Sequence, residues 1–338
     1  MQKTRVILGI TTRHDEGSTA DIKLQFVDAS DLSFVNTITA GQVLGFQPDG
    51  TRLFYLKGSG TDSLSFVKMN GYEKGTIAST GSFYTSLCFT SDSKIAIAWI
   101  GSLAGSEQCH FFDLENDVEI SAIDTSNNGS VGSVVSRDDK TAYFMGPLSA
   151  IALVDVENKS YIGKRTFSGE WGGGGTAGAL AVDHNDGYLY ISFHGSTGNI
   201  YRLNTSTNAI DTSFIATAGS NTGVGTRLSS IVVDPQDEYL YALNTDSNGD
   251  YNLYKLELST KTIVGTYPLA GTASASPQLK FHPADNNIIY VSFDDELKIF
   301  DVGDDDFTQT LALPGYVVSF DVAEVTYNPS GMVFGRFI

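Results

Sequence analysis

The side chains of this sequence that could do chemistry lie in long polar segments between short apolar runs. One such segment places oxygen-bearing side chains at every second position, at Asn244, Asp246, Asn248, Asp250 and Asn252. Such spacing can wrap a Ca²⁺ ion, which prefers oxygen ligands. The match to an EF-hand is weak, because a lysine stands where that loop has its last, bidentate glutamate. The alternative is a polar hairpin loop that uses Asn and Asp for positive φ angles. Calcium is the one cofactor that the sequence suggests.

A glycine-rich segment at residues 168–178 places Trp171 beside Glu170. An indole on a loop can stack on a sugar or anchor a protein partner, or it can fold back and cap its own unit. Residues 173–178 formally match the dinucleotide fingerprint GxGxxG, which needs a helix N-terminus to hold the pyrophosphate. The residues that follow indicate strand, turn and strand, so we reject a dinucleotide site.

Four further side chains in the long segments are candidate binding residues: His14, Asp15, His194 and Arg227. His14 and Asp15 are adjacent on a loop tip and therefore do not converge on one point. For His194 the alternative is a hairpin histidine with satisfied hydrogen bonds. The other histidines are expected in short turns or within a strand: His184, His282 and His110.

The elements that must position these side chains recur along the chain at intervals of about 45 residues. Each unit contains a short turn rich in Asp, Asn, Pro and Gly, followed by a strongly apolar strand. The turns lie at residues 47–50, 90–93, 136–140, 183–187, 234–238, 282–286 and 328–331. Most units then hold an apolar strand that ends at an acidic residue, as in CHFFD and LKIFD, and a more polar strand. Four strands per unit of this length predict the blades of an all-β, seven-bladed β-propeller.

Residues 287–311 give the clearest copy of the repeat, NIIYVSFDDELKIFDVGDDDFTQTL. This pattern resembles the YVTN-type repeat of microbial seven-bladed propellers over almost the whole chain. It differs from the WD40 family, because neither tryptophan belongs to a Trp-Asp pair and no Gly-His signature recurs. The resemblance implies the fold and little about activity, since such chains include binding proteins, cell-surface proteins and enzymes.

The two ends of the chain are expected to share one blade, giving a single domain over residues 1–338. Residues 1–40 contain three apolar runs, at 5–12, 22–28 and 32–38, and residues 318–338 contain two, at 324–331 and 332–338. Joining them would seal the ring and remove an open edge. Five runs are available for the four strand positions of the blade. Either 5–12 or 332–338 is therefore an extra edge strand, or one of them pairs outside the blade.

Loops held by a rigid scaffold often carry function, so we expect the face with the long segments to be the binding face. The starts of the innermost strands should line the mouth of the central channel there. These residues are Gln42, Ser86, Ser133, Gly178, Ser229, Gln278 and Glu324. With one carboxylate the ring is mostly neutral, whereas acid–base chemistry wants paired titratable groups and a metal wants several His or carboxylates.

Composition sets further limits on partners. The formal net charge is −18, from 39 acidic against 21 Lys and Arg residues, so the chain should repel nucleic acid. The acidity itself is explained by solubility. Cys88 and Cys109 are expected to be buried free thiols. No stretch is long enough to span a membrane, and the apolar run near the N-terminus is too short for a signal peptide. We therefore expect a cytoplasmic protein or one assembled into a virion.

These observations favour a non-catalytic propeller that binds a protein or a glycan through its long loops. By analogy, we expect it to be a structural component of a virion or another assembled particle. A lactonase-like hydrolase with Glu324 at the channel mouth is the alternative from the enzyme class. A calcium-stabilised carbohydrate binder is the third.

Overall fold

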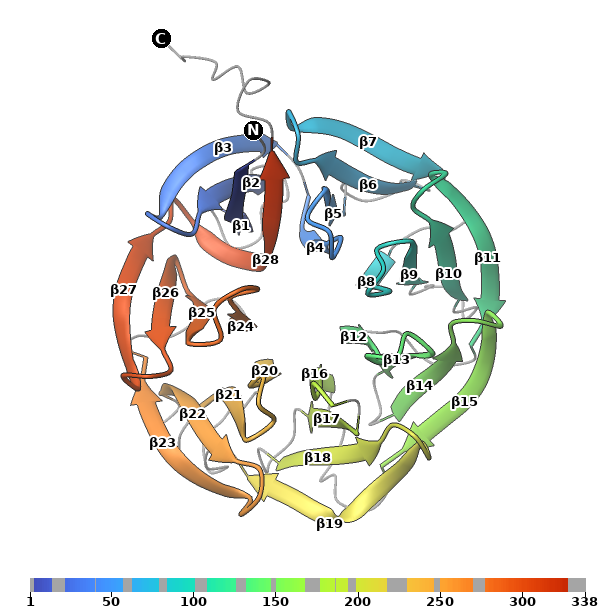
Figure 1. The fold of residues 1–338 in the computed structure, drawn as a ribbon, viewed down its shortest axis with the longest axis vertical. Coiled ribbons are helices and arrows are strands. Elements are labelled where there is room, and N and C mark those ends of the chain that lie inside the picture. The colour runs from blue at the N-terminus through green and yellow to red at the C-terminus, as the bar shows by residue number, and fades with distance from the viewer. Residues whose placement is uncertain are drawn as a thin grey trace.

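The protein folds into a ring of β-sheets arranged around one axis (Figure 1). The computed structural model describes residues 3–13, 22–39, 41–56, 63–78, 84–100, 108–125, 132–146, 150–167, 177–185, 187–193, 199–217, 230–245, 250–269 and 277–327. Over these ranges the chain forms strands and turns. The described residues contain no helix long and apolar enough to cross a membrane.

The described residues form seven antiparallel sheets of four strands, which are the blades of a seven-bladed β-propeller. The predicted fold class is therefore confirmed. The first two blades contain β4 (Val43–Phe46), β5 (Arg52–Tyr55), β6 (Ser63–Lys68), β7 (Glu73–Ala78), β8 (Tyr84–Phe89), β9 (Ile95–Ile100), β10 (Gln108–Asp113) and β11 (Val118–Asp124). The third and fourth contain β12 (Gly132–Val135), β13 (Thr141–Gly146), β14 (Ala150–Asp155), β15 (Ser160–Thr166), β16 (Ala177–Val182), β17 (Tyr188–Phe193), β18 (Asn199–Asn204) and β19 (Ala209–Thr217). The fifth and sixth contain β20 (Ser230–Val233), β21 (Tyr239–Thr245), β22 (Tyr251–Glu257), β23 (Thr262–Pro268), β24 (Gln278–Phe281), β25 (Ile288–Phe293), β26 (Glu296–Asp301) and β27 (Asp306–Ala312).

The seventh blade combines strands from both ends of the chain. From the centre outward its order is β28 (Tyr316–Tyr327), β1 (Lys3–Arg13), β2 (Ile22–Asp28) and β3 (Ser33–Thr39). Strand β1 pairs with β28 from Lys3↔Tyr327 to Arg13↔Tyr316, with one register shift between Thr11 and Thr12. The run at 5–12 thus takes the second place in the blade, and residues 328–338, including the last expected turn, lie outside the described residues.

The hydrophobic core is divided among the junctions between blades. In the described residues, each of the seven junctions holds a cluster of apolar side chains drawn from both neighbouring blades. At one junction Phe214 of the fourth blade packs with Leu240 and Leu256 of the fifth. A blade therefore buries its apolar surface only against its neighbours, as in other repeat proteins.

The tight turns between the first and second strands follow the expected sequence positions. Four of them contain a residue in the left-handed region, with φ of 69° at Gly50, 64° at Ser93, 58° at Asp139 and 57° at Asp237. Only glycine adopts this region without strain, and Asn and Asp tolerate it better than most other residues. Gly50, Asp139 and Asp237 suit this position, and Ser93 occupies it in the second blade. The equivalent marker Asp186 lies outside the described residues.

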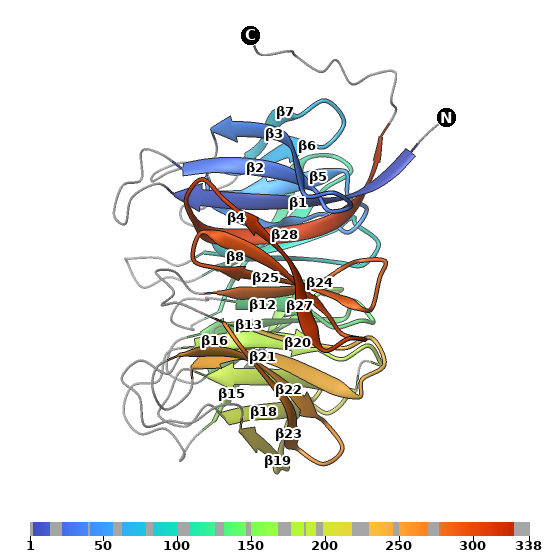
Figure 2. The same cartoon turned by 90° about the vertical axis from the view of Figure 1, so that its left-hand side faces the viewer.

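Antiparallel order divides the connections between two faces of the ring. The turns from first to second strand and from third to fourth strand lie on one face, which we call the turn face (Figure 2). The strand ends that lead to the long connections lie on the other, which we call the loop face.

Candidate functional site

The loop-face ends of the innermost strands surround a cavity of about 260 Å³, the loop-side cavity. All seven blades contribute to its wall. Its polar lining residues are Gln42, Thr85, Ser86, Ser133, Ser230, Gln278, Lys280 and Ser319. Hydroxyl and amide groups dominate this set, and they can donate or accept hydrogen bonds without carrying charge.

The sequence correctly predicted most of this mouth. Gln42, Ser86, Ser133, Gly178 and Gln278 all line the cavity. The expected residue of the fifth blade, Ser229, lies outside the described residues, and its neighbour Ser230 is in the wall.

The predicted place of Glu324 is wrong. Strand β28 begins at Tyr316, and Ser319 and Phe320 provide the seventh blade's part of the cavity wall. The carbonyl oxygen of Glu324 lies against the tight turn at Gly50, where an added Cβ would come within 1.8 Å of it. Glu324 is therefore on the turn face, away from the mouth it was expected to serve.

Strand β28 is bonded to both neighbouring blades by side chains on the channel edge. The two carboxylate oxygens of Asp321 bind in opposite directions, one to Lys280 Nζ at 3.1 Å and the other to the Phe46 N–H at 2.8 Å. Gln278 Oε1 accepts the Phe320 N–H at 3.1 Å. These contacts were not predicted from the sequence, although the charged residues Lys280 and Asp321 inside apolar inner strands were a signal.

A second cavity of about 540 Å³, the turn-side cavity, opens toward the turn face. It shares Ala179, Leu180, Ser230, Leu279 and Lys280 with the loop-side cavity, so the two are consecutive parts of one channel. Apolar side chains of β12, β16, β20 and β24 form most of its wall, and residues of the tight turns form its rim.

The candidate binding residues of the long loops are not part of the described structure. Trp171, Glu170, His14, Asp15, His194 and Arg227 all lie outside the described residues. Their role in binding stays a prediction.

The candidate calcium ligands divide between the blade and the loop. Asn244 and Asn252 face each other across β21 and β22 and are buried, at 0% and 6% exposure. Asn252 Nδ2 donates to the Asp250 carbonyl at 3.1 Å. Asp250 is exposed, whereas Asp246 and Asn248 lie outside the described residues. The calcium site therefore stays a prediction. Two of its candidate ligands, Asn244 and Asn252, lie inside the fifth blade.

Comparison with known proteins supports the fold. No family model and no curated protein matches the sequence. Among solved structures, hydrazine synthase of Kuenenia stuttgartiensis superposes with a TM-score of 0.66 at 14% identity, covering 81% of this chain and 86% of that one. Apo AztD of Citrobacter koseri gives a TM-score of 0.62 at 13% identity, covering 95% of this chain and 99% of that one. A further AztD structure from Citrobacter koseri gives a TM-score of 0.61 at 14% identity, covering 96% of this chain and 100% of that one. At such identities the similarity shows a shared β-propeller fold alone.

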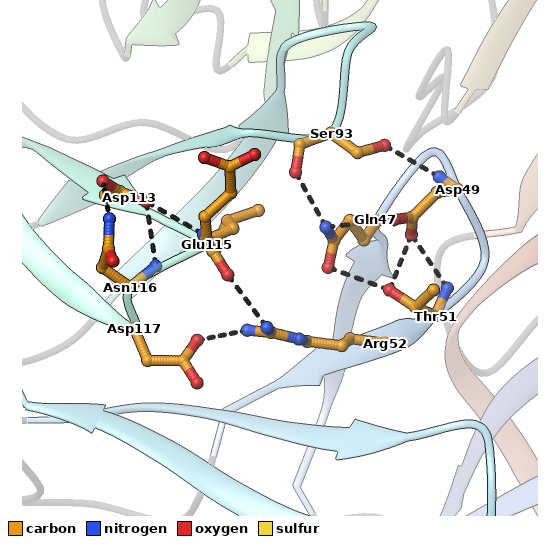
Figure 3. A network of polar contacts seen from close by, with 10 residues as sticks. Gln47, Asp49, Thr51, Arg52, Ser93, Asp113, Glu115, Asn116 and Asp117 are labelled. Carbon is orange, nitrogen blue, oxygen red and sulfur yellow. Dashed lines mark hydrogen bonds and ion pairs between the residues drawn. The ribbon is translucent and has the colours of Figure 1, made fainter.

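On the turn face, the described ionisable side chains mainly hold turns and join blades. Figure 3 shows the network between the first and second blades. Gln47 Nε2 donates to the Ser93 carbonyl at 2.8 Å, and the Asp49 N–H donates to Ser93 Oγ at 2.9 Å. Arg52 donates to the Leu114 carbonyl at 2.9 Å and pairs with the Asp117 carboxylate.

The acidic residues that end the third strands have the same kind of role. Asp113 Oδ1 accepts the N–H groups of Glu115 at 2.9 Å and Asn116 at 3.0 Å, and Oδ2 accepts the Asn116 amide at 2.8 Å. These bonds lower the pKa of Asp113 and favour its charged form. The acidic marker of the repeat is thus a turn cap.

The two cysteines are buried and free, as predicted. Burial raises the pKa of Cys88 to about 12 and that of Cys109 well above its ordinary value. Because the thiolate is the nucleophile and the metal ligand, these thiols are inert at neutral pH.

Proposed function

We propose that this chain is a non-catalytic binding propeller that presents its loop face to a glycan or a partner protein. The observation that carries the proposal is the lining of the loop-side cavity, where hydroxyl and amide side chains from six of the seven blades meet at one mouth. Among the described residues of this lining, Lys280 is the one cationic side chain, and it is paired with Asp321 at 3.1 Å. Uncharged donors and acceptors suit hydroxyl groups of a sugar or amide groups of a peptide.

The lactonase alternative loses its candidate acid. It relied on Glu324 at the channel mouth, and this residue lies on the turn face. A general acid or base must lie within hydrogen-bond reach of the substrate. The neutral mouth therefore favours binding over proton transfer.

Two finer points are part of the proposal. The assembled-particle setting, such as a virion, is supported by composition and by analogy. The YVTN-type nature of the repeat is supported by residues 287–311, which supply β25, β26 and most of β27.

The proposal can be tested by measuring binding to immobilised glycans and to native partners. The unchanged protein is compared with the variants Gln42→Ala and Trp171→Ala. Gln42 is exposed at the mouth, and Gln309→Ala on the outermost strand β27 is the matched control. We expect about a tenfold loss of affinity for either loop-face variant and none for the control, since a few central residues dominate most interfaces. Isolation of a free monomer that hydrolyses lactones and captures neither ligand would contradict the proposal.

A further inference from the structure

The loop-side cavity has a nearly neutral lining, and its one charge is already paired. Among the described lining residues Lys280 is the one charged side chain, and its ammonium group lies 3.1 Å from the Asp321 carboxylate. A bound anion would need an unpaired cation and a bound cation an unpaired carboxylate, and the described lining offers neither. The ligand that suits this wall is therefore uncharged.

Two side chains of the wall are fixed by one hydrogen bond and keep further donors. Gln278 Oε1 accepts the Phe320 N–H at 3.1 Å, so within the described part of the chain the Gln278 amide keeps its two N–H donors. Ser230 Oγ accepts the Leu279 N–H at 3.0 Å, and its own O–H remains to donate. Both bonds join neighbouring blades, so these groups are held in place before a ligand binds.

Two further polar side chains line the cavity from the first and second blades. Gln42 is exposed, and its carboxamide has no hydrogen-bond partner among the described residues. Thr85 is exposed too, and its hydroxyl donates to the Trp99 carbonyl at 3.4 Å, which leaves the oxygen to accept. Together with Ser230 and Gln278, hydrogen-bonding groups therefore reach the cavity from four blades.

The fourth blade gives the cavity an apolar side. Its lining residues are Gly178, Ala179 and Leu180, whose side chains form no hydrogen bonds, and Ala179 and Leu180 remain partly exposed. In Figure 1 their strand β16 lies across the ring from β28 and β4. The wall thus combines a polar arc with one apolar sector.

A single sugar ring has the matching chemistry. Its hydroxyl groups project in several directions from a compact body, so one ring can bond to several blades at once. Its C–H groups can cover the exposed part of Ala179 and Leu180. The cavity of about 260 Å³ has the volume of about nine water molecules, at about 30 Å³ each in the liquid, which is room for one ring.

We propose that the loop-side cavity binds one neutral sugar ring, either a free monosaccharide or the end of a longer glycan. Gln278, Ser230 and Gln42 bind its hydroxyl groups, and Ala179 and Leu180 contact its C–H groups. This inference rests on the proposed function of the loop face, of which it specifies the ligand and the place.

Ligand-observed NMR titration of the full-length protein tests the proposal. The probes are the methyl glycosides of glucose, galactose and mannose, and N-acetylglucosamine. We expect saturable binding of at least one, with a dissociation constant on the order of 1 mM, because so small a ligand makes few contacts. N-acetylalaninamide, a neutral peptide analogue of similar size, should not saturate the site.

The two sources of the ring are distinguished by a linear oligosaccharide that ends in the bound sugar. If the cavity takes the end of a glycan, the oligosaccharide should bind at least as tightly as the methyl glycoside. If it takes a free monosaccharide, the oligosaccharide should bind more weakly.

Variants of the wall place the bound ring in the cavity. Gln42→Leu removes hydrogen bonds to the ligand without removing a described side-chain bond of the fold, and should weaken sugar binding about tenfold. Gln309→Leu, the same change at an exposed position of β27, is the matched control and should bind normally. Thr85→Phe adds a ring at the cavity and should abolish binding, whereas Thr310→Phe on β27 should not. Unchanged far-ultraviolet circular dichroism spectra are the check on folding.

The inference is overturned if none of the sugars saturates the site, or if their affinity is the same in Gln42→Leu as in Gln309→Leu. Saturation by N-acetylalaninamide alone would also overturn it and would mark the cavity as a peptide site. If immobilised glycans or partner proteins are retained at the loop face while no single ring binds, the proposed function stands and this inference fails. If nothing is retained there either, both fail.

Discussion

At the scale of single residues, the first position of a tight turn needs an acceptor for backbone N–H groups. Asp234 Oδ1 accepts the N–H groups of Glu238 and Tyr239, each at 2.8 Å. In the sixth blade a histidine has this place. His282 Nδ1 accepts the N–H groups of Ala284 at 3.1 Å and Asp285 at 2.9 Å. This nitrogen must therefore be unprotonated in the folded protein.

The His282 turn predicts a loss of stability in acid. Burial lowers the pKa of His282 below its ordinary 6.5, against the opposing charges of Asp285 and Glu324. The unfolded chain then binds more protons, so the contribution to stability is complete above about pH 6.5 and is lost as pH falls below it. Burial also lowers the pKa of His110, which acts in the same direction.

Urea unfolding of His282→Asn measures how much of the loss of stability in acid is due to this one residue. An Asn oxygen keeps an acceptor at the turn without titrating. Between about pH 7.5 and about pH 5.5 the free energy of unfolding should fall less in His282→Asn than in the unchanged protein. Equal losses in the two proteins would show that His282 does not carry the effect.

At the scale of the elements, the left-handed residue of a tight turn also bonds the preceding blade. Asp237 Oδ1 accepts the His184 N–H at 2.7 Å, and Oδ2 accepts the Asn185 N–H at 3.0 Å. Asp237→Ala removes these acceptors and places alanine at a positive φ. We expect a loss of about 1–2 kcal/mol in the free energy of unfolding, measured by urea titration.

The control for this loss is Asp304→Ala, which removes an exposed carboxylate from the turn between β26 and β27. It should change stability by less than about 0.5 kcal/mol. If both variants unfold at the same urea concentration, the contact between the fourth and fifth blades makes no measurable contribution to the free energy of unfolding.

How much could be predicted from the sequence also depends on the element. The tight turns were predictable because Asp, Asn, Pro and Gly are concentrated in them, and Gly50 and Asp237 occupy the left-handed position in two of them. The residues at the channel mouth could be predicted by counting back along each innermost strand from its tight turn. This worked for the first six blades because their innermost strands have four to six residues. The count failed at Glu324 because β28 has twelve residues and no described hairpin turn fixes its end.

Contacts between blades were not predictable from the repeat. Seven turns between third and fourth strands contain a left-handed residue, and its identity varies among Leu32, Tyr72, Asp117, Lys159, Asn208, Lys261 and Asp305. Asp117 pairs with Arg52 of the preceding blade, whereas Lys261 donates to the Ser213 carbonyl at 2.5 Å. The position is fixed by the fold, but its partner is a group 48 to 65 residues away in these two cases, which lies near it only once the ring has formed.

At the scale of the whole molecule, closure of the ring relies on the seventh blade. Strand β28 pairs with β1 over eleven residue pairs, and the two strands come from opposite ends of the chain. Asp321 and Gln278 add the side-chain bonds that hold β28 to the first and sixth blades. No turn joins β1 to β28, so this blade forms only when the two ends of the chain meet, and loop closure of that length costs entropy.

A covalent link between the two ends should therefore stabilise the ring more than a link inside one blade. Thr4 and Thr326 are exposed partners in the pairing of β1 with β28, so Thr4→Cys with Thr326→Cys would close nearly the whole chain into one loop. The chain-entropy model gives more stability for a longer loop, and we expect about 3 kcal/mol or more. The control is Glu296→Cys with Ala312→Cys, partners in β26 and β27 that close a short loop. Urea unfolding of each protein, oxidised and then reduced, should show a larger difference for the closing blade. Equal differences would mean that ring closure does not limit stability.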